Sequence, residues 1–176
     1  MLKKITASLA LAIVVLLIYV ALKPGQMLVA REILMRASAE TIFPYMNNSK
    51  KANDWMPWQD SDPDVKIFYS GPEEGIGSKS SWDSKGKMGT GEALVIESVF
   101  NQMVKTQLTY TKPFQMAQIA ELSLTSEGGG TKVRWSVSGH NGFFFRLIGV
   151  FINCDKMIGG EFEKGLLKLK SKVENT

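Results

Sequence analysis

The segment that most constrains the fold is the last one, residues 143–173, because it carries a single continuous apolar stripe. Apolar side chains recur there every three or four residues, which is the spacing of one face of an α-helix. The stripe consists of Leu147, Phe151, Cys154, Ile158, Phe162, Leu166, Leu169 and Val173. We therefore predict one long amphipathic helix over residues 143–173. Such a helix needs a partner surface that covers its stripe.

Three glycines interrupt this helix, at Gly159, Gly160 and Gly165. Each costs about 1 kcal/mol relative to alanine inside a helix, so their presence needs a structural reason. A glycine removes side-chain volume and lets another group approach the helix backbone. That group is either the sheet, in which case the glycines permit tight packing, or a ligand, in which case they shape a cavity. Both interpretations can hold at different positions.

The middle of the chain predicts the partner surface, because short runs alternate apolar and polar residues. Turn-forming clusters separate the runs at hairpin spacing, and strands with one packed and one wet face are typical of an antiparallel sheet. We expect strands at residues 26–36, 65–69, 76–84, 89–99, 103–111, 115–125 and 131–138. Ser38 favours a short helix from Ala39, and a second short helix or turn is expected at residues 47–55. The expected class is α+β.

The first part of the chain is an apolar run. Residues 5–22 carry no charge over 18 positions, which is long enough to cross a hydrocarbon core of about 30 Å. Two interpretations compete, an uncleaved membrane anchor and a cleaved signal peptide. The run ends without a good A-x-A-like cleavage site, so we favour a transmembrane anchor over residues 1–23 and a folded domain over residues 24–176. Lys3 and Lys4 favour an extracytoplasmic domain, in the periplasm or at the cell exterior.

The charge distribution argues against a nucleic-acid binder. The net charge is +4, but three of the 21 basic side chains lie in the first 23 residues, which hold no acid. The other residues carry 18 basic side chains against 17 acidic ones and are therefore close to neutral. Because nucleic-acid recognition needs a clustered basic surface, we expect no nucleic-acid partner.

Metal and cofactor sites have little support in this sequence. The single cysteine, Cys154, forms no internal disulfide and excludes a zinc site built on cysteines, and the single histidine, His140, excludes a histidine-rich metal site. The acids near the turns lack the glycine and the terminal glutamate of a calcium loop. These acids are Asp54, Asp60, Asp62 and Asp64. We expect no metal and no cofactor.

A series of short motifs follows in order over residues 27–174, beginning with a strand and a helix start at residues 29–43. The later motif residues are Trp55, Trp58, Gln59, segments 69–72 and 75–78, Trp82, segment 89–91, Glu97, segment 130–135, Asp155, Gly159, Phe162, Glu163, Gly165, Leu166, Leu169 and Lys170. In this order they resemble the START-like or SRPBCC superfamily, and within it the bacterial polyketide cyclase/dehydrase-like members. The resemblance implies a helix-grip fold, with about seven antiparallel strands in a curved sheet wrapped around the long C-terminal helix. It also implies an apolar ligand cavity between helix and sheet.

The implied cavity needs a mostly apolar lining with a few polar groups. The candidate ligand-binding residues are Trp55, Trp58, Tyr69, Trp82, Glu97, Tyr110, Met116, Trp135, Phe144 and Gly159. Trp55 and Trp58 lie in an irregular acidic stretch and are expected at the cavity mouth. For each aromatic residue the alternative is ordinary core packing. Glu97 is a candidate to point inward, where burial would raise its pKa and mark a site.

Three functions fit these features. The first is a membrane-anchored binding module for a hydrophobic small molecule or lipid, without catalytic residues. The second is an enzyme of the cyclase/dehydrase kind, in which a cavity acid, Tyr110 or His140 transfers a proton. The third is a structural or partner-binding protein of the envelope with a filled core. An apolar cavity supports the first function, a buried Glu97 or a cavity-facing His140 the second, and the lack of a continuous cavity the third.

Overall fold

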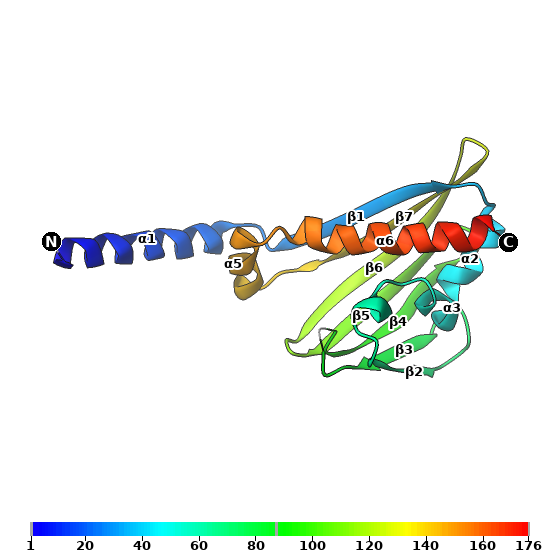
Figure 1. Ribbon diagram of the computed structural model, residues 1–176, viewed down its shortest axis with the longest axis horizontal. Helices are drawn as coiled ribbons and strands as arrows, with labels where there is room; N and C mark the ends of the chain where they lie inside the picture. Colours follow the sequence, from blue (N-terminus) through cyan, green and yellow to red (C-terminus); the bar gives the residue numbers. More distant parts are fainter. Residues whose placement is uncertain (1, 87, 176) are drawn as a thin grey trace.

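The computed structural model describes residues 2–86 and 88–175, and within them it forms one seven-stranded sheet (Figure 1). The strands are β1 (Gln26–Met35), β2 (Lys66–Ser70), β3 (Lys79–Asp83), β4 (Thr90–Val99), β5 (Met103–Lys112), β6 (Met116–Glu127) and β7 (Gly130–His140). Their order across the sheet is β1-β7-β6-β5-β4-β3-β2, and every neighbouring pair is antiparallel. The predicted α+β fold with its antiparallel sheet is confirmed.

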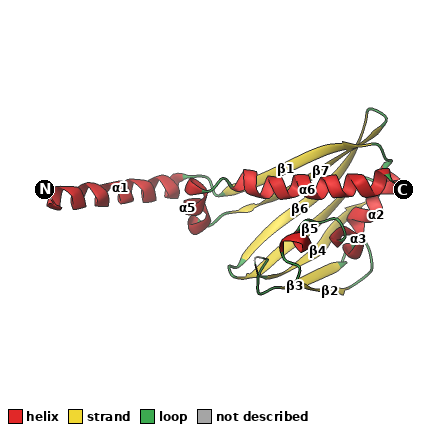
Figure 2. Ribbon diagram, viewed as in Figure 1, coloured by secondary structure: helices red, strands yellow, loops and turns green. Residues whose placement is uncertain are grey.

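The helices of the described residues lie before, between and after the strands (Figure 2). They are α1 (Leu2–Leu22), α2 (Ala39–Asn47), α3 (Ser49–Asn53), α4 (Trp58–Ser61), α5 (Phe143–Phe151) and α6 (Cys154–Glu174). The short helices α2 and α3 follow β1 as the sequence predicts. Ser38 caps α2, because its hydroxyl accepts a hydrogen bond from the Thr41 amide at 3.2 Å.

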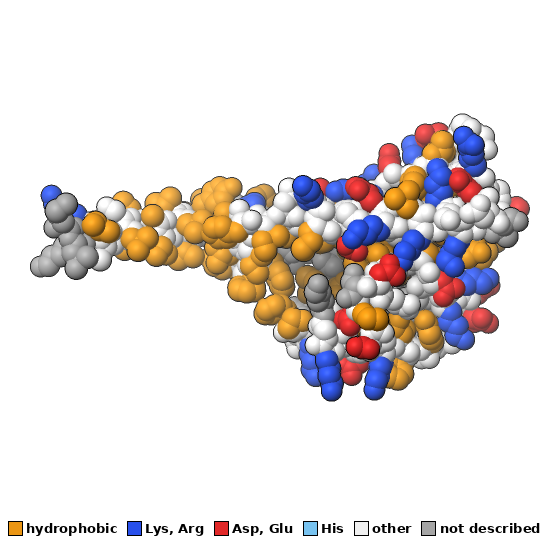
Figure 3. Space-filling view, viewed as in Figure 1, with side chains coloured by type: hydrophobic (Ala, Val, Ile, Leu, Met, Phe, Trp, Pro, Cys, Tyr) orange, Lys and Arg blue, Asp and Glu red, His pale blue; other side chains and the backbone are white. Residues whose placement is uncertain are grey.

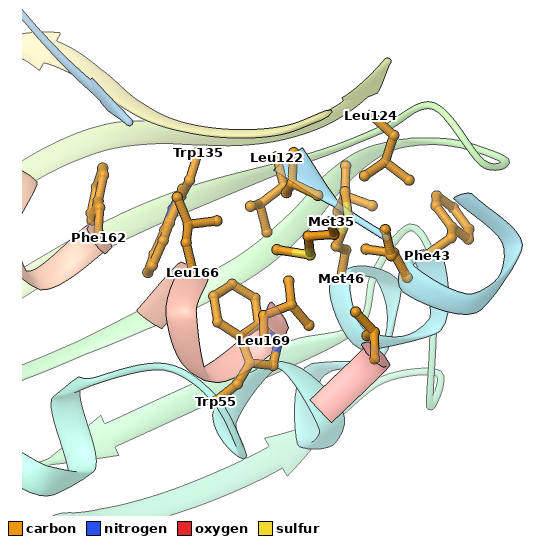
Figure 4. Close-up of a cluster of buried hydrophobic side chains, with 14 of the residues drawn as sticks. Met35, Phe43, Met46, Trp55, Leu122, Leu124, Trp135, Phe162, Leu166 and Leu169 are labelled. Carbon is orange, nitrogen blue, oxygen red and sulfur yellow. The ribbon is translucent and has the colours of Figure 1, made fainter. Parts of the chain in front are cut away.

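The hydrophobic core lies between α6 and the inner face of the sheet (Figure 4). α6 runs alongside β1 and β7 (Figure 1) and buries the later part of the predicted stripe, Phe162, Leu166, Leu169 and Val173. The sheet contributes Val29, Met35, Val95, Val104, Leu122, Leu124, Val133, Trp135 and Val137, and the segment after β1 contributes Ile42, Phe43, Met46 and Trp55. The sheet is therefore the partner surface that the stripe requires.

The predicted single helix over residues 143–173 is wrong in one respect, because it is broken after Phe151. Ile152 and Asn153 have extended or near-extended backbones, with φ/ψ of −118°/128° and −79°/90°. The Asn153 side chain then caps α6 by accepting a hydrogen bond from the Lys156 amide at 2.9 Å. A side-chain cap starts a new helix in a new direction. The early stripe residues on α5 consequently do not join the core, and no described residue of α5 is buried.

α1 extends away from the sheet, and α5 lies beside its C-terminal end (Figure 1). The segment Lys4–Leu22 has 19 residues and a mean hydropathy of 2.8, and 6% of it is buried. Such a helix near the N-terminus is either a possible membrane span or a signal sequence.

Candidate apolar ligand site

A row of side chains crosses four strands on the inner face of the sheet. Trp82 pairs with Gly91, Gly91 with Tyr110, and Tyr110 with Met116. Directly paired residues of antiparallel strands point to the same face. Gly91 also shares a face with Val95, four residues further along β4, and Val95 belongs to the core. The row therefore continues the inner face beyond the core, toward the end of the sheet that lies near α1.

The core does not reach this row. Val104, Leu122 and Trp135 are buried in the core, whereas Leu108 is only partly buried and the side chains of Trp82, Tyr110 and Met116 are half-buried. α6 covers the β1 and β7 side of the sheet, so the part of the inner face formed by β3 to β6 is less covered.

Trp82 and Tyr110 form the aromatic floor of the row. Their rings meet edge to face with centroids 5.5 Å apart, and the Trp82 indole donates a hydrogen bond to the Met88 carbonyl at 3.2 Å. A Cβ at Gly91 would lie 2.5 Å from Cζ2 of Trp82, so only glycine lets the indole lie against the strand. Burial raises the pKa of the Tyr110 hydroxyl above its ordinary value of 10.0, so this phenol is a neutral hydrogen-bonding group at neutral pH.

An apolar pocket adjoins the row at Met116. It has a volume of about 500 Å³ and lies between the β5–β6 turn, the end of β7 and the start of α5. It is lined by Phe114, Gln115, Met116, Ala117, His140, Gly142, Phe143, Phe144 and Phe145. The Phe114 ring contacts those of Phe144 and Phe145, with centroids 5.4 and 5.6 Å away. We name this pocket and the row Trp82–Gly91–Tyr110–Met116 together the proximal site.

Three of the predicted tryptophans, Trp55, Trp58 and Trp135, lie in a packed cluster under α6, away from the proximal site. Trp135 stacks on Phe162 with centroids 4.1 Å apart and an interplanar angle of 10°, and Trp55 and Trp58 meet its ring edge to face. Trp55 is fully buried and donates a hydrogen bond to the Tyr45 carbonyl at 2.9 Å. The expectation that Trp55 lies at a cavity mouth is therefore wrong. The cluster is ordinary core packing, which was the alternative for these residues.

The glycines of α6 are explained mostly by packing. A Cβ at Gly159 would collide with the Arg31 guanidinium, which is bound there to Asp155 (3.0 Å) and Glu163 (2.7 Å). A Cβ at Gly165 would lie 2.8 Å from Cζ3 of Trp135. Gly159 thus makes room for an arginine of β1 rather than for a ligand. A Cβ at position 160 would meet nothing within 4 Å, so nothing in the structure explains why this residue is a glycine.

Glu97 does not point inward. Its carboxylate is 2.9 Å from the Lys105 ammonium, and its side chain is 46% exposed. The reason is a bulge in β4, where Val95 pairs with Thr106 and Glu97 with the adjacent Lys105. The extra residue, Ile96, reverses the alternation, so Glu97 moves to the outer face. The idea of a buried, site-marking Glu97 is therefore wrong.

Tyr69 lies on the edge strand β2, apart from the proximal site. Its hydroxyl accepts a hydrogen bond from the Asn53 amide nitrogen at 3.1 Å, and the Lys50 ammonium lies 5.9 Å from its ring centroid. A second pocket, of about 440 Å³, is lined by Gln59, Asp60, Pro63, Val65, Ile67 and Tyr69. This surface is more polar than the proximal site and suits an apolar ligand less well.

The structure brings four predicted residues together at the proximal site, namely Trp82, Tyr110, Met116 and Phe144. Sequence reasoning missed Gly91 and Phe114 as members of the site. Phe145 belongs to the run of three phenylalanines from Phe143 that also contains the candidate Phe144. His140 lines the pocket, although as an acid or base it has no carboxylate partner among the residues that line the pocket with it.

Comparison with known proteins identifies the fold but no family. No protein-family model and no curated protein matches the chain. Among solved structures it is similar to the Aha1 dimer from Colwellia psychrerythraea (20% identity, 84% of this chain and 96% of that chain, TM-score 0.58). It is also similar to protein MLL2253 from Mesorhizobium loti (16% identity, 85% of this chain and 98% of that chain, TM-score 0.59). A third similar structure is Ara h 8.0201 (12% identity, 86% of this chain and 100% of that chain, TM-score 0.60). At these identities the likeness shows the shared helix-grip fold.

Proposed function

We propose that this chain is a membrane-anchored binding module that holds a hydrophobic small molecule or lipid in the proximal site. One observation carries the proposal: an aromatic pocket of about 500 Å³ adjoins, at Met116, a half-buried row of side chains on the inner sheet face. This volume lies within the range of about 300–1,000 Å³ that is usual for ligand sites. The resemblance to the START-like superfamily, which implies an apolar ligand cavity, supports the same function.

The driving force for such binding is burial of apolar ligand surface. Burying about 400 Å² would contribute about 10 kcal/mol at roughly 25 cal/mol per Å². Association costs at least about 4 kcal/mol, which leaves at most about 6 kcal/mol. The tightest Kd that this allows is in the tens of micromolar, a useful affinity for a ligand that is concentrated in a membrane.

An enzyme of the cyclase/dehydrase kind is the alternative, and the site favours it less. Proton transfer needs a positioned acid or base with a suitable pKa. His140 is the ionisable side chain among the residues that line the pocket, and it is exposed. Tyr110 is neutral at neutral pH with its ordinary pKa of 10.0, and burial raises that pKa further, so it serves better as a hydrogen-bond donor than as a base.

The anchor in this proposal is α1, with the transmembrane segment over residues 1–23 and the binding domain over residues 24–176. The length and hydropathy of Lys4–Leu22 support a membrane span. The paired lysines at the start of the chain support an extracytoplasmic domain. The proximal site then lies near the bilayer, because its pocket is lined by α5, which packs beside the end of α1.

Native mass spectrometry of the full-length chain, purified in a mild detergent, tests the binding proposal. The wild type should carry an additional mass that is lost on denaturation, and extraction should identify it as an apolar compound. Met116→Glu places a carboxylate in the pocket, so it should weaken the affinity for the ligand by about tenfold or more, equivalent to about 1.4 kcal/mol, and lower the bound fraction.

Met103→Glu is the matched control, because Met103 lies at the other end of β5, away from the pocket. It should retain the additional mass. A protein that stays free of ligand, even after incubation with mixed membrane lipids, would contradict the proposed function. Equal retention by the Met116 and Met103 variants would place the ligand elsewhere.

A further inference from the structure

α5 exposes an unusual number of large apolar side chains. Its sequence FFFRLIGVF contains no acid and a single base, Arg146. The exposed fractions are 42% for Phe143, 51% for Phe144 and 74% for Phe151, and Ile152 directly after the helix is 47% exposed. A contiguous apolar surface of this kind marks an interaction site.

The position of α5 is fixed relative to α1. The Arg146 guanidinium donates hydrogen bonds through Nη1 to the carbonyls of Ala21, at 3.2 Å, and Lys23, at 2.7 Å. These carbonyls belong to the last turn of α1 and to the residue that follows it. Figure 1 shows α5 lying crosswise at this end of α1. If α1 crosses a bilayer, α5 therefore lies at the level where the bilayer surface begins.

The apolar surface of α1 continues onto α5, and neither helix contains an acidic residue. Figure 3 shows hydrophobic side chains along α1 and over the adjoining end of the domain, whereas most acidic and basic side chains lie further from α1. Phe114, on the β5–β6 turn, is 49% exposed and contacts Phe144, so it extends the same surface. Lys23 and Arg146 lie at the same level, where basic groups can reach lipid phosphates.

We propose that α5 is an interfacial helix that docks on the lipid surface beside α1, with Phe144 and Phe151 inserted at the boundary between headgroups and acyl chains. A helix that combines apolar and aromatic side chains with a basic residue suits this position. Phe144 also lines the pocket of the proximal site, so docking makes the pocket open toward the bilayer. The inference rests on the proposed anchoring by α1, and it adds the surface through which a lipid enters.

Spin labels on the full-length chain in vesicles of phosphatidylcholine and phosphatidylglycerol test this inference. In a Cys154→Ala background, single cysteines replace Phe151, Phe100 or Val15. Phe100 is the matched control, because its side chain is 73% exposed and that of Phe151 is 74% exposed. Phe100 lies on the β4–β5 turn, at the other end of the sheet. Val15 reports the middle of α1.

A label in lipid collides more with oxygen than with a water-soluble nickel chelate. We expect this pattern at positions 15 and 151, and the opposite pattern at position 100. A label at position 151 that behaves like the one at position 100 overturns the inference, and so does an aqueous label at position 15. Shielding from both reagents, with dipolar broadening between labels, would instead identify a second copy of this chain as the occupant and would also overturn it.

Ligand content measured by native mass spectrometry on the same samples separates the two proposals. An aqueous position 151 in a protein that still carries an apolar ligand removes interfacial docking and keeps the binding function. A lipid-exposed position 151 in a protein without ligand keeps interfacial docking and removes the binding function.

Discussion

Replacing Gly165 with alanine should destabilise the protein, whereas the same replacement at Gly160 should stabilise it. Both glycines lie inside α6, so both variants gain the helix propensity of alanine, about 1 kcal/mol. They differ in what the new methyl group meets. At Gly165 it would lie 2.8 Å from Cζ3 of Trp135 and 3.1 Å from Cδ of Pro57, whereas at Gly160 it meets nothing within 4 Å.

The contact at Gly165 is costly because Trp135 has little room to move. Its ring is stacked on Phe162 at 4.1 Å and bordered by Trp55 at 5.2 Å. Overpacking of a well-packed core costs about 1–3 kcal/mol. Gly165→Ala should therefore lose up to about 2 kcal/mol after the propensity gain. The propensity term cancels when the two variants are compared, so their difference should equal the overpacking cost, about 1–3 kcal/mol.

Thermal unfolding of the full-length chain in detergent, followed by circular dichroism, measures this difference. For a chain of this size 1 kcal/mol corresponds to about 2–4 °C in Tm, so the two variants should differ by at least about 2 °C. If Gly165→Ala were as stable as Gly160→Ala, the argument that Gly165 exists to admit Trp135 would be refuted. The packing explanation of the helix glycines would then fail at its clearest position.

Two further predictions concern ionisable groups. The hydrogen bond from Arg31 holds the pKa of Asp155 below its ordinary value of 3.8, so the stability contributed by this pair is present above about pH 4 and is lost as the pH falls through the folded-state pKa. The decrease in Tm on acidification should be smaller in Arg31→Gln, and Arg134→Gln is the control; an unchanged acid profile in Arg31→Gln would contradict this assignment. Burial raises the pKa of Tyr110, so its contribution is present below about pH 10 and is lost as the pH rises through the folded-state pKa. The absorbance of ionised tyrosine should show one late-titrating group that disappears in Tyr110→Phe; a late group that persists in this variant would belong to another tyrosine.

The main features of the fold follow from two periodicities in the sequence. Alternation of apolar and polar residues predicts all seven strands, and the stripe at Phe162, Leu166, Leu169 and Val173 predicts the helix that covers them. Both patterns are determined by burial against one shared core, so each supports the other. The order from β2 to β7 follows from connections between successive strands, whereas β1 pairs with the last strand, β7, at the far side of the sheet.

The alternation of apolar and polar residues fails to predict which face a side chain lies on where a β-bulge adds a residue to a strand. The bulge at Ile96 adds one residue to β4 and sends Glu97 outward to Lys105, and no residue type in this stretch marks the bulge. The aromatic residues present a different difficulty. A tryptophan that lines a cavity and one that fills the core, such as Trp82 and Trp135, have the same local pattern, because their burial depends on how far α6 extends over the sheet.

The break between α5 and α6 explains why the first part of the predicted stripe is exposed and the second part is buried. Asn153 ends the continuity of the predicted helix, so Phe151 no longer follows α6 along β1 and remains exposed beside α1. An apolar stripe predicts burial without specifying whether protein or lipid provides the cover, because both exclude water from the same side chains. With the proposed docking of α5, the stripe of residues 143–173 is divided between two environments. Its second part is covered by the sheet, and its first part is free for the lipid surface that the spin-label experiment tests.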